Sequence, residues 1–377
     1  MKNVVIAGYA RSPFTLANKG ALTRVRPDDL AAQLVAALIE RTKVRPQDIE
    51  DVIVGCAFPE GEQGFNVGRL IGLLAGLPQS VAGMTVNRFC GSSMQSIHIA
   101  AGQIQLDAGD AFIAAGIESM TRVPMMGFNP LPNPTLQAKV HAYISMGDTA
   151  ENVAGKWHIS REAQEAFAVR SQQRAAAAAK AGRFKDEIVP ITSKHGIVDT
   201  DGCIRPDTTA AGLAQLKPAF SQTGTVTAGT SSPLTDGASA VLVCSEDYAA
   251  KHGLTPLARI VSVAVAGCAP DIMGIGPVGA TQKALLRAKL EMSAIDVVEL
   301  NEAFASQALA CAHDLGIRDD TLNIDGGAIA LGHPLGATGA RIVGKAASLL
   351  QRVGGRYALA TQCIGGGQGI ATILERI

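Results

Sequence analysis

The chain of 377 residues has few aromatic side chains and no excess of charge of either sign. It contains one Trp, four Tyr and ten Phe, and its 33 basic residues balance its 33 acidic residues. Surface binding to nucleic acid or to an anionic membrane needs a basic field, and base stacking needs aromatic rings. The composition therefore predicts no nucleic-acid partner.

Long apolar runs and paired cysteines are also absent from the sequence. No apolar run reaches the ~18 residues that a membrane-spanning helix needs, and MKNVVIAGYARSPF at the start favours a first strand over a signal peptide. The seven cysteines are odd in number, widely spaced and without a C-x-x-C pair. This pattern argues against a disulfide framework or a zinc site and favours a reducing compartment. We expect a soluble cytoplasmic protein without a metal.

Short apolar runs recur along the chain, and they alternate with helical stretches such as 28–42. Alternation of this kind predicts an α/β fold with a parallel or mixed sheet that is covered on both faces. The expected strands are NVVIAG (3–8), DVIVGC (51–56), AFIAAG (111–116), VVELNE (297–302) and YALATQ (357–362).

A weak internal repeat lies within this alternation. DIEDVIVGCAF (48–58) resembles SAIDVVELNEAF (293–304), and Asp51 lies 245 residues before Asp296. Cys90 and His333 have nearly the same separation, 243 residues. Equal spacing predicts two similar α/β halves.

The segment 120–233 interrupts the repeat. It contains a Pro- and Asn-rich stretch, a helix that we expect to begin after Ser160 and to end before Gly182, and a further stretch with many Pro and Gly residues. We interpret it as a loop domain inserted into the first half and suited to cover a substrate. The predicted domains are 1–119, completed by 234–255, then the loop domain 120–233, then the second half 256–377.

NRFCGSSMQS (87–96) places Cys90 between a predicted strand and a predicted helix. Met94, Ile97, Ala101 and Ile104 fall on one face of that helix. A cysteine near a helix N-terminus is favoured as a thiolate, and Gly91 and Ser92 would leave room for a substrate. The alternative is a small buried hydrophobe, which is the usual role of a free cysteine.

Three more segments have candidate chemistry, each with a structural alternative. GGAIALGHPLGATGAR (326–341) presents His333 in a glycine-rich loop, although it matches no phosphate-binding pattern and is compatible with a plain turn. CIGGGQG (363–369) offers Cys363 with a possible anion-binding run of N–H groups, or a tight turn between strands. In NEAFA (301–305), Asn301 is a candidate site residue or a helix N-cap. All four side chains are expected at one edge of the sheets, which suggests thiol chemistry with an oxyanion hole.

These motifs, together with VTAGTSSPLTDGASAV, resemble the thiolase family over essentially the whole chain and in the same order. The resemblance implies the thiolase fold, with layers α-β-α-β-α, and acyl transfer between coenzyme A thioesters. The implied reaction is cleavage of a 3-ketoacyl-CoA by CoA to acetyl-CoA and a shortened acyl-CoA, or the reverse Claisen condensation. Fatty-acid β-oxidation is the implied setting.

The resemblance also implies roles for particular residues. Cys90 would be the acylated nucleophile, His333 would take its proton, and Cys363 would be the acid or base at the α-carbon. His333 and a water held by Asn301 would bind the enolate oxygen, and the N–H groups of Cys90 and Gly365 would bind the tetrahedral oxyanion. Coenzyme A would be a substrate rather than a cofactor, with no other cofactor implied. The matching CoA-contact positions are Ser232, Met146, Arg205 and Phe304.

One departure from the family pattern bears on the substrate. Members devoted to acetoacetyl-CoA often have His-Met-Gly where this chain has Ser145-Met146-Gly147. This substitution favours the broad degradative thiolases. The shorter insertion favours a homodimer, with a homotetramer as the other possibility.

Three alternatives stay open from the sequence. A biosynthetic acetoacetyl-CoA thiolase would use the same residues. A ketoacyl synthase would share the fold and the nucleophile but would not need Cys363. A non-catalytic CoA-binding subunit would be expected to lose a catalytic residue, whereas all four are present here.

Overall fold

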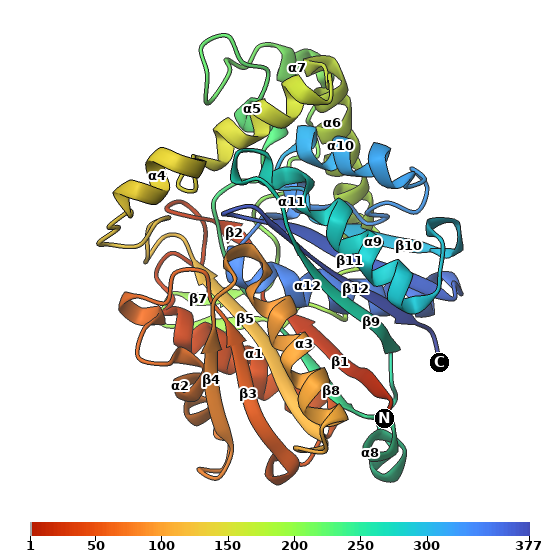
Figure 1. Cartoon of the computed structure of the whole chain (residues 1–377). Coiled ribbons are helices and arrows are strands. Elements are labelled where there is room, and N and C mark those ends of the chain that lie inside the picture. The colour runs from red at the N-terminus through yellow and green to blue at the C-terminus, as the bar shows by residue number, and fades with distance from the viewer. Residues whose placement is uncertain (1) are drawn as a thin grey trace.

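The strands of the computed structural model, which describes residues 2–377, form one large mixed sheet made of two parts (Figure 1). The two parts meet where β1 pairs with β9 at Val5–Arg259 and Ile6–Ala258. The first part has the order β4 (Ala82–Val86), β3 (Ile49–Gly55), β5 (Ala111–Ser119), β8 (Thr235–Ser245), β1 (Val4–Arg11), with β2 (Thr15–Leu16) beside β8. The second part continues with β9 (Ala258–Gly267), β12 (Gln368–Glu375), β11 (Tyr357–Ile364), β10 (Val297–Leu300).

The two parts repeat one topology. In the first part, β3 is parallel to β4 and β5, and β5, β8 and β1 are antiparallel neighbours. In the second part, β10 is parallel to β11, and β11, β12 and β9 are antiparallel neighbours. A parallel bridge between Leu322 and Val298 stands in the place of β4. The predicted strands and the two similar halves are confirmed.

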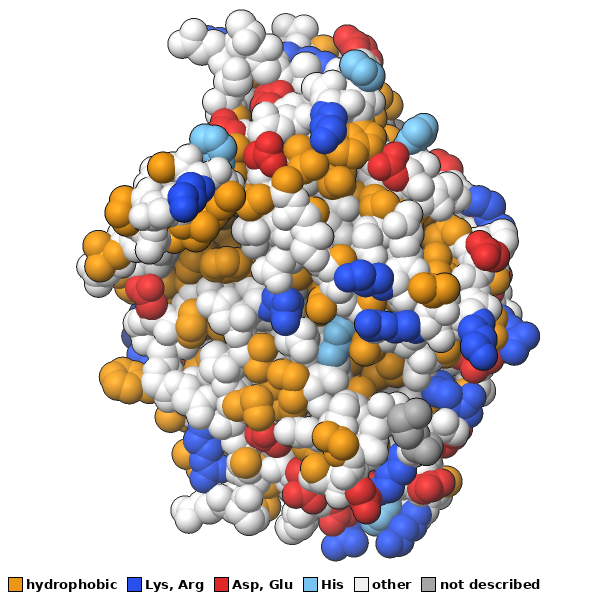
Figure 2. Space-filling model, viewed as in Figure 1, with side chains coloured by type: hydrophobic (Ala, Val, Ile, Leu, Met, Phe, Trp, Pro, Cys, Tyr) orange, Lys and Arg blue, Asp and Glu red, His pale blue; other side chains and the backbone are white. Residues whose placement is uncertain are grey.

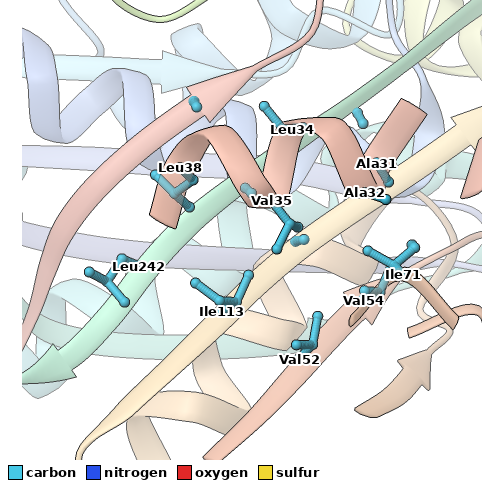
Figure 3. Close-up of a cluster of buried hydrophobic side chains, with 14 of the residues drawn as sticks. Ala31, Ala32, Leu34, Val35, Leu38, Val52, Val54, Ile71, Ile113 and Leu242 are labelled. Carbon is cyan, nitrogen blue, oxygen red and sulfur yellow. The ribbon is translucent and has the colours of Figure 1, made fainter. Parts of the chain in front are cut away.

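Helices and sheets alternate in five layers. Helices α1 (Pro27–Thr42) and α2 (Val67–Leu74) cover the outer face of the first part. Figure 3 shows Val35 and Leu38 of α1 near Ile113 of β5 and Leu242 of β8, and Ile71 of α2 beside Val54 of β3. Helices α3 (Ser92–Gln105) and α12 (Leu335–Val353) lie between the two parts. Helices α9 (Gly276–Ala288) and α10 (Ala305–Leu315) cover the second part. The predicted α-β-α-β-α packing is confirmed, and the covered strands are apolar on both faces.

Local sequence explains where these elements begin and end. Helix α1 starts with Pro27 and two aspartates in its first turn, and it ends at Lys43 in the left-handed conformation. The predicted apolar face of α3 is buried at Met94, Ile97, Ala101 and Ile104. No helix in residues 2–377 is both long and apolar enough to cross a bilayer.

The helices between β5 and β8 lie at the top and upper left of Figure 1, whereas the two short strands of this segment lie beside the first part of the sheet. Ser160 caps α6 by accepting a hydrogen bond from the Ala163 N–H, and Gly182 follows the end of that helix, as predicted. The helices are α4 (Pro134–Val140), α5 (Met146–Lys156), α6 (Arg161–Lys180) and α7 (Ala210–Ala214), and the strands are β6 (Ile191–Ser193) and β7 (Gly196–Val198).

Helix α6 packs against the second half, although its segment is inserted in the first. The Ser171 hydroxyl donates to Glu302 Oε2 at 2.6 Å, and the Gln172 amide donates to the Ile329 carbonyl at 3.1 Å in α11 (Ala328–Leu331). The segment is inserted in the first half along the chain, as expected. Its helix α6, however, packs on the second half, which was not expected. The boundaries at 119, 233 and 255 stay a prediction.

A buried ion-pair network ties the inserted segment to both halves. Arg11 of β1 pairs with Glu187 at 2.8 Å and with Asp201 at 2.7 Å. Lys345 of α12 pairs with the same Glu187 at 3.0 Å and with Asp325 at 2.8 Å. Removing one partner would leave a buried charge uncompensated, so the network favours a single arrangement of these segments.

Candidate active site

A cavity of about 260 Å³ lies between the two halves and the inserted segment. Cys90, His333 and Cys363 all line it, as do Met146, Ser232 and Phe304. The predicted convergence of the two cysteines and the histidine is therefore present. The remaining lining residues are Met120, Met125, Ser145, Gly147, Phe220, Ser231, Pro233, Leu234, Met273, Ala303 and Leu335.

Cys90 sits in a 3-10 turn, Phe89–Gly91, that leads directly into α3. The preceding Phe89 has φ +42°, a left-handed conformation that a non-glycine residue adopts only when its surroundings impose it. The Asn87 side chain accepts a hydrogen bond from the Phe89 N–H at 2.8 Å, and the Ser92 hydroxyl donates to the Phe89 carbonyl at 2.6 Å. The Gln362 amide also donates to the Cys90 carbonyl. These bonds hold the cysteine at the helix start.

The room expected beside Gly91 is used for packing instead. A Cβ at Gly91 would lie 2.6 Å from the Ile364 side chain of β11. The Ser92 hydroxyl is occupied by its hydrogen bond to the Phe89 carbonyl within the turn. The expectation that these two residues open the approach for a substrate is wrong. Their small size lets β11 and α3 come together.

His333 lies two residues before α12, as Cys90 lies two residues before α3. Its Nδ1 is 2.7 Å from the Thr338 hydroxyl, which itself donates to the Pro334 carbonyl at 3.0 Å. Because that hydroxyl uses its proton on the carbonyl, it accepts from Nδ1–H. This assignment leaves Nε2 unprotonated and able to accept a proton.

Asn301 is in contact with His333 rather than capping a helix. Its Nδ2 lies 3.4 Å from His333 Nε2, and α10 begins only at Ala305, with Phe304 as its N-cap. Asn301 Oδ1 is buried and accepts no hydrogen bond from residues 2–377. A buried acceptor without a partner is costly, and it is suited to hold a water or a substrate group.

Cys363 and Gly365 lie where β11 turns into β12. The glycine run makes the tight hairpin that was the structural alternative, with positive φ at Gly366 and Gly367. The N–H groups of Gly365 and of Cys90 itself act on the Cys90 thiol and oppose the rise in its pKa. The tight-turn interpretation of CIGGGQG is therefore confirmed, and anion binding by its N–H groups stays a prediction.

Burial makes all three titratable groups neutral at rest. Burial raises the pKa of the Cys90 thiol to about 11, although the two N–H groups beside the thiol act to lower it. Burial also raises the pKa of Cys363 well above its usual value, and the neighbouring Cys90 adds to that rise. Burial, with a smaller contribution from Arg341, lowers the pKa of His333 to about 3. The expectation that the helix start makes Cys90 a thiolate is wrong for the resting site, because desolvation outweighs it.

The order of motifs agrees with two family models, "Thiolase, N-terminal domain" over residues 4–247 and "Thiolase, C-terminal domain" over residues 254–376. The chain belongs to the thiolase family. It is 48% identical over 389 residues to a 3-ketoacyl-CoA thiolase of Bacillus subtilis, with all of both chains covered. It is 51% identical over 391 residues to one of Vibrio cholerae, again with full coverage.

Solved structures show the same relationship. Human mitochondrial 3-ketoacyl-CoA thiolase in complex with CoA superimposes with a TM-score of 0.92 at 40% identity, covering 100% of this chain and 98% of that one. The thiolase fold is therefore established for the whole chain.

Two positions that the thiolase resemblance singled out have a clear structural setting. Ser145 lines the cavity and caps α5, accepting from the Asp148 N–H at 3.2 Å and donating to the Asp148 carboxylate at 2.7 Å. Arg205 does not reach the catalytic cavity. It lines a second cavity of about 290 Å³ with Thr208, Thr209 and others.

Several supporting residues of this thiolase site were not foreseen. Thr338 orients His333, Gln362 holds the Cys90 turn, and buried Glu302 accepts from Ser171 and from the Asn323 amide at 2.8 Å. Only Thr338 could have been predicted from the sequence, because its hydroxyl lies one helical turn after the His-Pro pair. The other two depend on contacts between segments far apart in the chain.

Proposed function

We propose that this thiolase cleaves 3-ketoacyl-CoA with coenzyme A, giving acetyl-CoA and an acyl-CoA shortened by the acetyl unit. The observation that carries the proposal is the convergence of Cys90, His333 and Cys363 on one cavity, beside an Asn301 oxygen that has no hydrogen-bond partner among the described residues 2–377. Full-length relatives named 3-ketoacyl-CoA thiolase support it and do not favour the biosynthetic condensation of two acetyl-CoA. The enzyme is an acyltransferase.

In the first half-reaction, the Cys90 thiol gives its proton to His333 Nε2 and its sulfur attacks the 3-keto carbon. The N–H groups of Cys90 and Gly365 stabilise the oxyanion. Collapse breaks the bond between the 2- and 3-carbons, leaving an acyl thioester on Cys90. The departing acetyl-CoA enolate takes the Cys363 proton, while protonated His333 and an Asn301-bound water stabilise the enolate oxygen.

The second half-reaction returns the site to its resting protonation. The Cys363 thiolate takes the proton of an incoming CoA thiol, and the CoA sulfur attacks the acyl group on Cys90. The Cys90 sulfur then leaves and recovers its proton from His333. The cavity is small and buried, which limits hydrolysis of the thioester by water.

Coenzyme A is proposed to bind as a substrate across the two cavities. Consecutive residues connect them: Ala228 and Gly229 line the outer cavity, and Ser231 and Ser232 line the catalytic one. Ser232, Met146 and Phe304 would contact the pantetheine arm, and Arg205 would lie near the nucleotide. No further cofactor or metal is proposed.

A homodimer formed through β4 is proposed over a homotetramer. Strand β4 is at the edge of the sheet, where its outer N–H and C=O groups have no neighbouring strand in residues 2–377. Large apolar side chains beside it are exposed, with Phe65 at 94% and Leu74 and Phe89 less so. An edge strand flanked by apolar side chains favours pairing with a second copy.

The cytoplasm is proposed as the location of the enzyme. All seven cysteines are free, including the two that must stay reduced for the proposed chemistry. A reducing compartment keeps such thiols available.

The test is CoA-dependent release of acetyl-CoA from 3-ketoacyl-CoA, with Cys90→Ala as the control. Incubation without added CoA should leave an acyl adduct on the peptide that contains Cys90, detected by mass spectrometry. Cleavage that requires Cys90, together with this adduct, is the expected result. Cleavage by the Cys90→Ala variant, or an adduct on another cysteine, would contradict the proposed mechanism.

A further inference from the structure

A buried ion pair that the proposed mechanism does not use joins α12 to β10. Arg341 Nη1 donates to Glu299 Oε2 at 2.8 Å, and the two side chains are 2% and 1% exposed. Figure 2 shows charged side chains spread over the surface, which is their usual place. Taking two charges out of water has a cost that their mutual attraction often does not exceed, so stability alone is a weak reason for this pair.

The pair lies next to the catalytic groups on both elements. Side chains alternate along a strand, so Glu299 of β10 and Asn301, just past its end, lie on the same face. The Asn301 N–H donates to a carbonyl of β11 at 3.0 Å, which keeps Asn301 in register with the strand. On α12, Arg341 follows Thr338 by three residues and shares its helix face. Thr338 is the residue that orients His333.

Two contacts therefore lie side by side between β10 and the start of α12. One is the ion pair between Glu299 and Arg341, and the other is the 3.4 Å contact between Asn301 Nδ2 and His333 Nε2. Two residues of a strand span about 6.6 Å and three residues of a helix about 4.5 Å, so the two contacts are neighbours. A shift of β10 along α12 at the ion pair would also move Asn301 relative to His333.

Strand β10 needs a directional contact to fix it against α12. It is four residues long and lies at the edge of the sheet, with β11 on one side and a single bridge to Leu322 on the other. Its Val297 side chain belongs to an apolar cluster that includes residues of α12, and apolar contacts have no preferred direction. A hydrogen bond between charged groups has one. The ion pair therefore sets the position of β10 along the helix.

The pair is held by a single hydrogen bond. Arg341 Nε and Nη2 and Glu299 Oε1 have no hydrogen-bond partner among residues 2–377. An arginine that binds a carboxylate most tightly uses both arms of its guanidinium. Here one N–H and one positive charge define the contact, so a lysine ammonium that reaches Glu299 should substitute for it.

We propose that Glu299 and Arg341 are positioning residues whose ion pair fixes β10 against α12. The fixed strand keeps Asn301, with the water that it would hold, and His333 at one enolate oxygen. This inference rests on the proposed function, because it deepens the same site. It predicts a selective defect: the second half-reaction transfers the acyl group between Cys90 and CoA without forming an enolate. Loss of the pair should therefore slow carbon–carbon cleavage and spare acyl transfer.

The test compares two reactions that pass through the same butyryl group on Cys90. One is the cleavage of 3-ketohexanoyl-CoA by CoA, and the other is the exchange of deuterium-labelled CoA into butyryl-CoA, followed by mass spectrometry. The double variant Glu299→Leu/Arg341→Met removes both charges, so that neither is left buried without its partner. Its kcat for cleavage is expected to fall by about 10- to 100-fold, as for a misplacement of about 1 Å. Its exchange rate should stay within about threefold of the wild type.

Three single variants separate positioning from stability. Arg341→Lys keeps the charge and one N–H, and it should cleave within about fivefold of the wild type. Glu299→Gln keeps the shape of the pair without its charge; it should show the selective loss at about three- to tenfold, and it replaces the double variant if that does not fold. Lys345→Met is the matched control, because Lys345 is a buried cation of α12 whose partners, Glu187 and Asp325, lie off β10. The control should keep the wild-type ratio of cleavage to exchange.

A double-mutant cycle tests whether the pair acts through Asn301. In the Asn301→Ala enzyme, removal of the pair should lower the remaining kcat for cleavage by less than about threefold, because the group that the pair positions is already gone. Losses that multiply would overturn the inference.

The outcomes separate this inference from the proposed function. Equal losses of cleavage and exchange in the pair variants would show a purely structural role and overturn the inference, and so would unchanged cleavage. In both cases the wild-type thiolase reaction would stand. A wild-type enzyme that exchanges CoA but does not cleave the 3-ketoacyl substrate would overturn the proposed function and the inference with it.

Discussion

The two halves of the molecule place different side chains at equivalent points of one topology. Cys56 is the first residue after β3, and Asn301 is the first residue after β10. Glu118 is the second-last residue of β5, and Cys363 is the second-last residue of β11. The strand ends of the first half therefore carry Cys56 and Glu118 where those of the second half carry Asn301 and Cys363.

The difference lies in how fully the polar atoms are used. Glu118 accepts hydrogen bonds from the Ala57 N–H at 2.8 Å, the Gln63 amide at 3.0 Å and the Gly336 N–H at 2.8 Å. In the second half, Asn301 Oδ1 has no partner in residues 2–377 and Cys363 faces the cavity. At these strand ends, the polar groups of the first half are satisfied within the protein, whereas those of the second half stay available at the cavity.

Removing the thiol of Cys363 should have the largest effect. Cys363→Ala is expected to lower kcat by about 10³- to 10⁴-fold, because the enolate loses its proton donor. The measurements are kcat from steady-state kinetics and the acylation of Cys90 from mass spectrometry after rapid quenching. A loss below tenfold would mean that another group supplies the proton, and the contrast between the halves would fail.

Asn301 and Cys56 offer a matched pair at the two strand ends. Asn301→Ala is expected to lower kcat by about 10²- to 10³-fold, since the enolate oxygen loses its ordered donor. Cys56→Ala should stay within about threefold, because its thiol contacts only scaffold groups, the Glu118 carboxylate at 3.8 Å and the Gln63 amide at 3.4 Å. Steady-state kinetics on one 3-ketoacyl-CoA measure both changes. Equal losses of kcat in the two variants would contradict the proposed difference between the strand ends of the two halves.

Glu118 should affect stability rather than chemistry. Glu118→Gln presents an amide N–H₂ to the N–H donors that now point at the carboxylate, which costs about 2 kcal/mol of unfolding free energy. A thermal melt should show a lower Tm, with kcat of the folded enzyme little changed. An unchanged Tm, or a kcat loss like that of Cys363→Ala, would show that Glu118 is not merely scaffold.

The smallest expected effect is that of pH on kcat/KM. With the pKa of His333 lowered to about 3 and that of Cys90 raised to about 11, the neutral pair persists between these values. The kcat/KM for the ketoacyl substrate should therefore be flat between about pH 5.5 and 7.5, the interval in which an ordinary histidine titrates. An inflection near pH 6.5 that disappears in His333→Asn would instead show that His333 titrates at its ordinary pKa and is not kept neutral by burial.

Local patterns allowed much of this structure to be predicted, and distant contacts account for the rest. The apolar runs predicted β3 and β5, and the equal spacing of Cys90 and His333 predicted matching turns. The side on which α6 packs was not predictable, because Ser171 and Glu302 lie far apart in the chain. The resting charge of Cys90 was missed for a related reason: its burial depends on segments from both halves and from the insertion.

The glycines of α12 set a spacing that no local pattern reveals. A Cβ at Gly339 would lie 2.2 Å from the Met94 nitrogen of α3, and one at Gly336 would lie 2.6 Å from the Ile117 carbonyl. Since α3 begins just after Cys90 and α12 just after His333, the close approach of the two helices fixes the spacing between the proposed nucleophile and the proposed base. A side chain added at Gly339 would force α3 and α12 apart, and the missing Cβ of one glycine therefore sets the path for the proposed proton transfer.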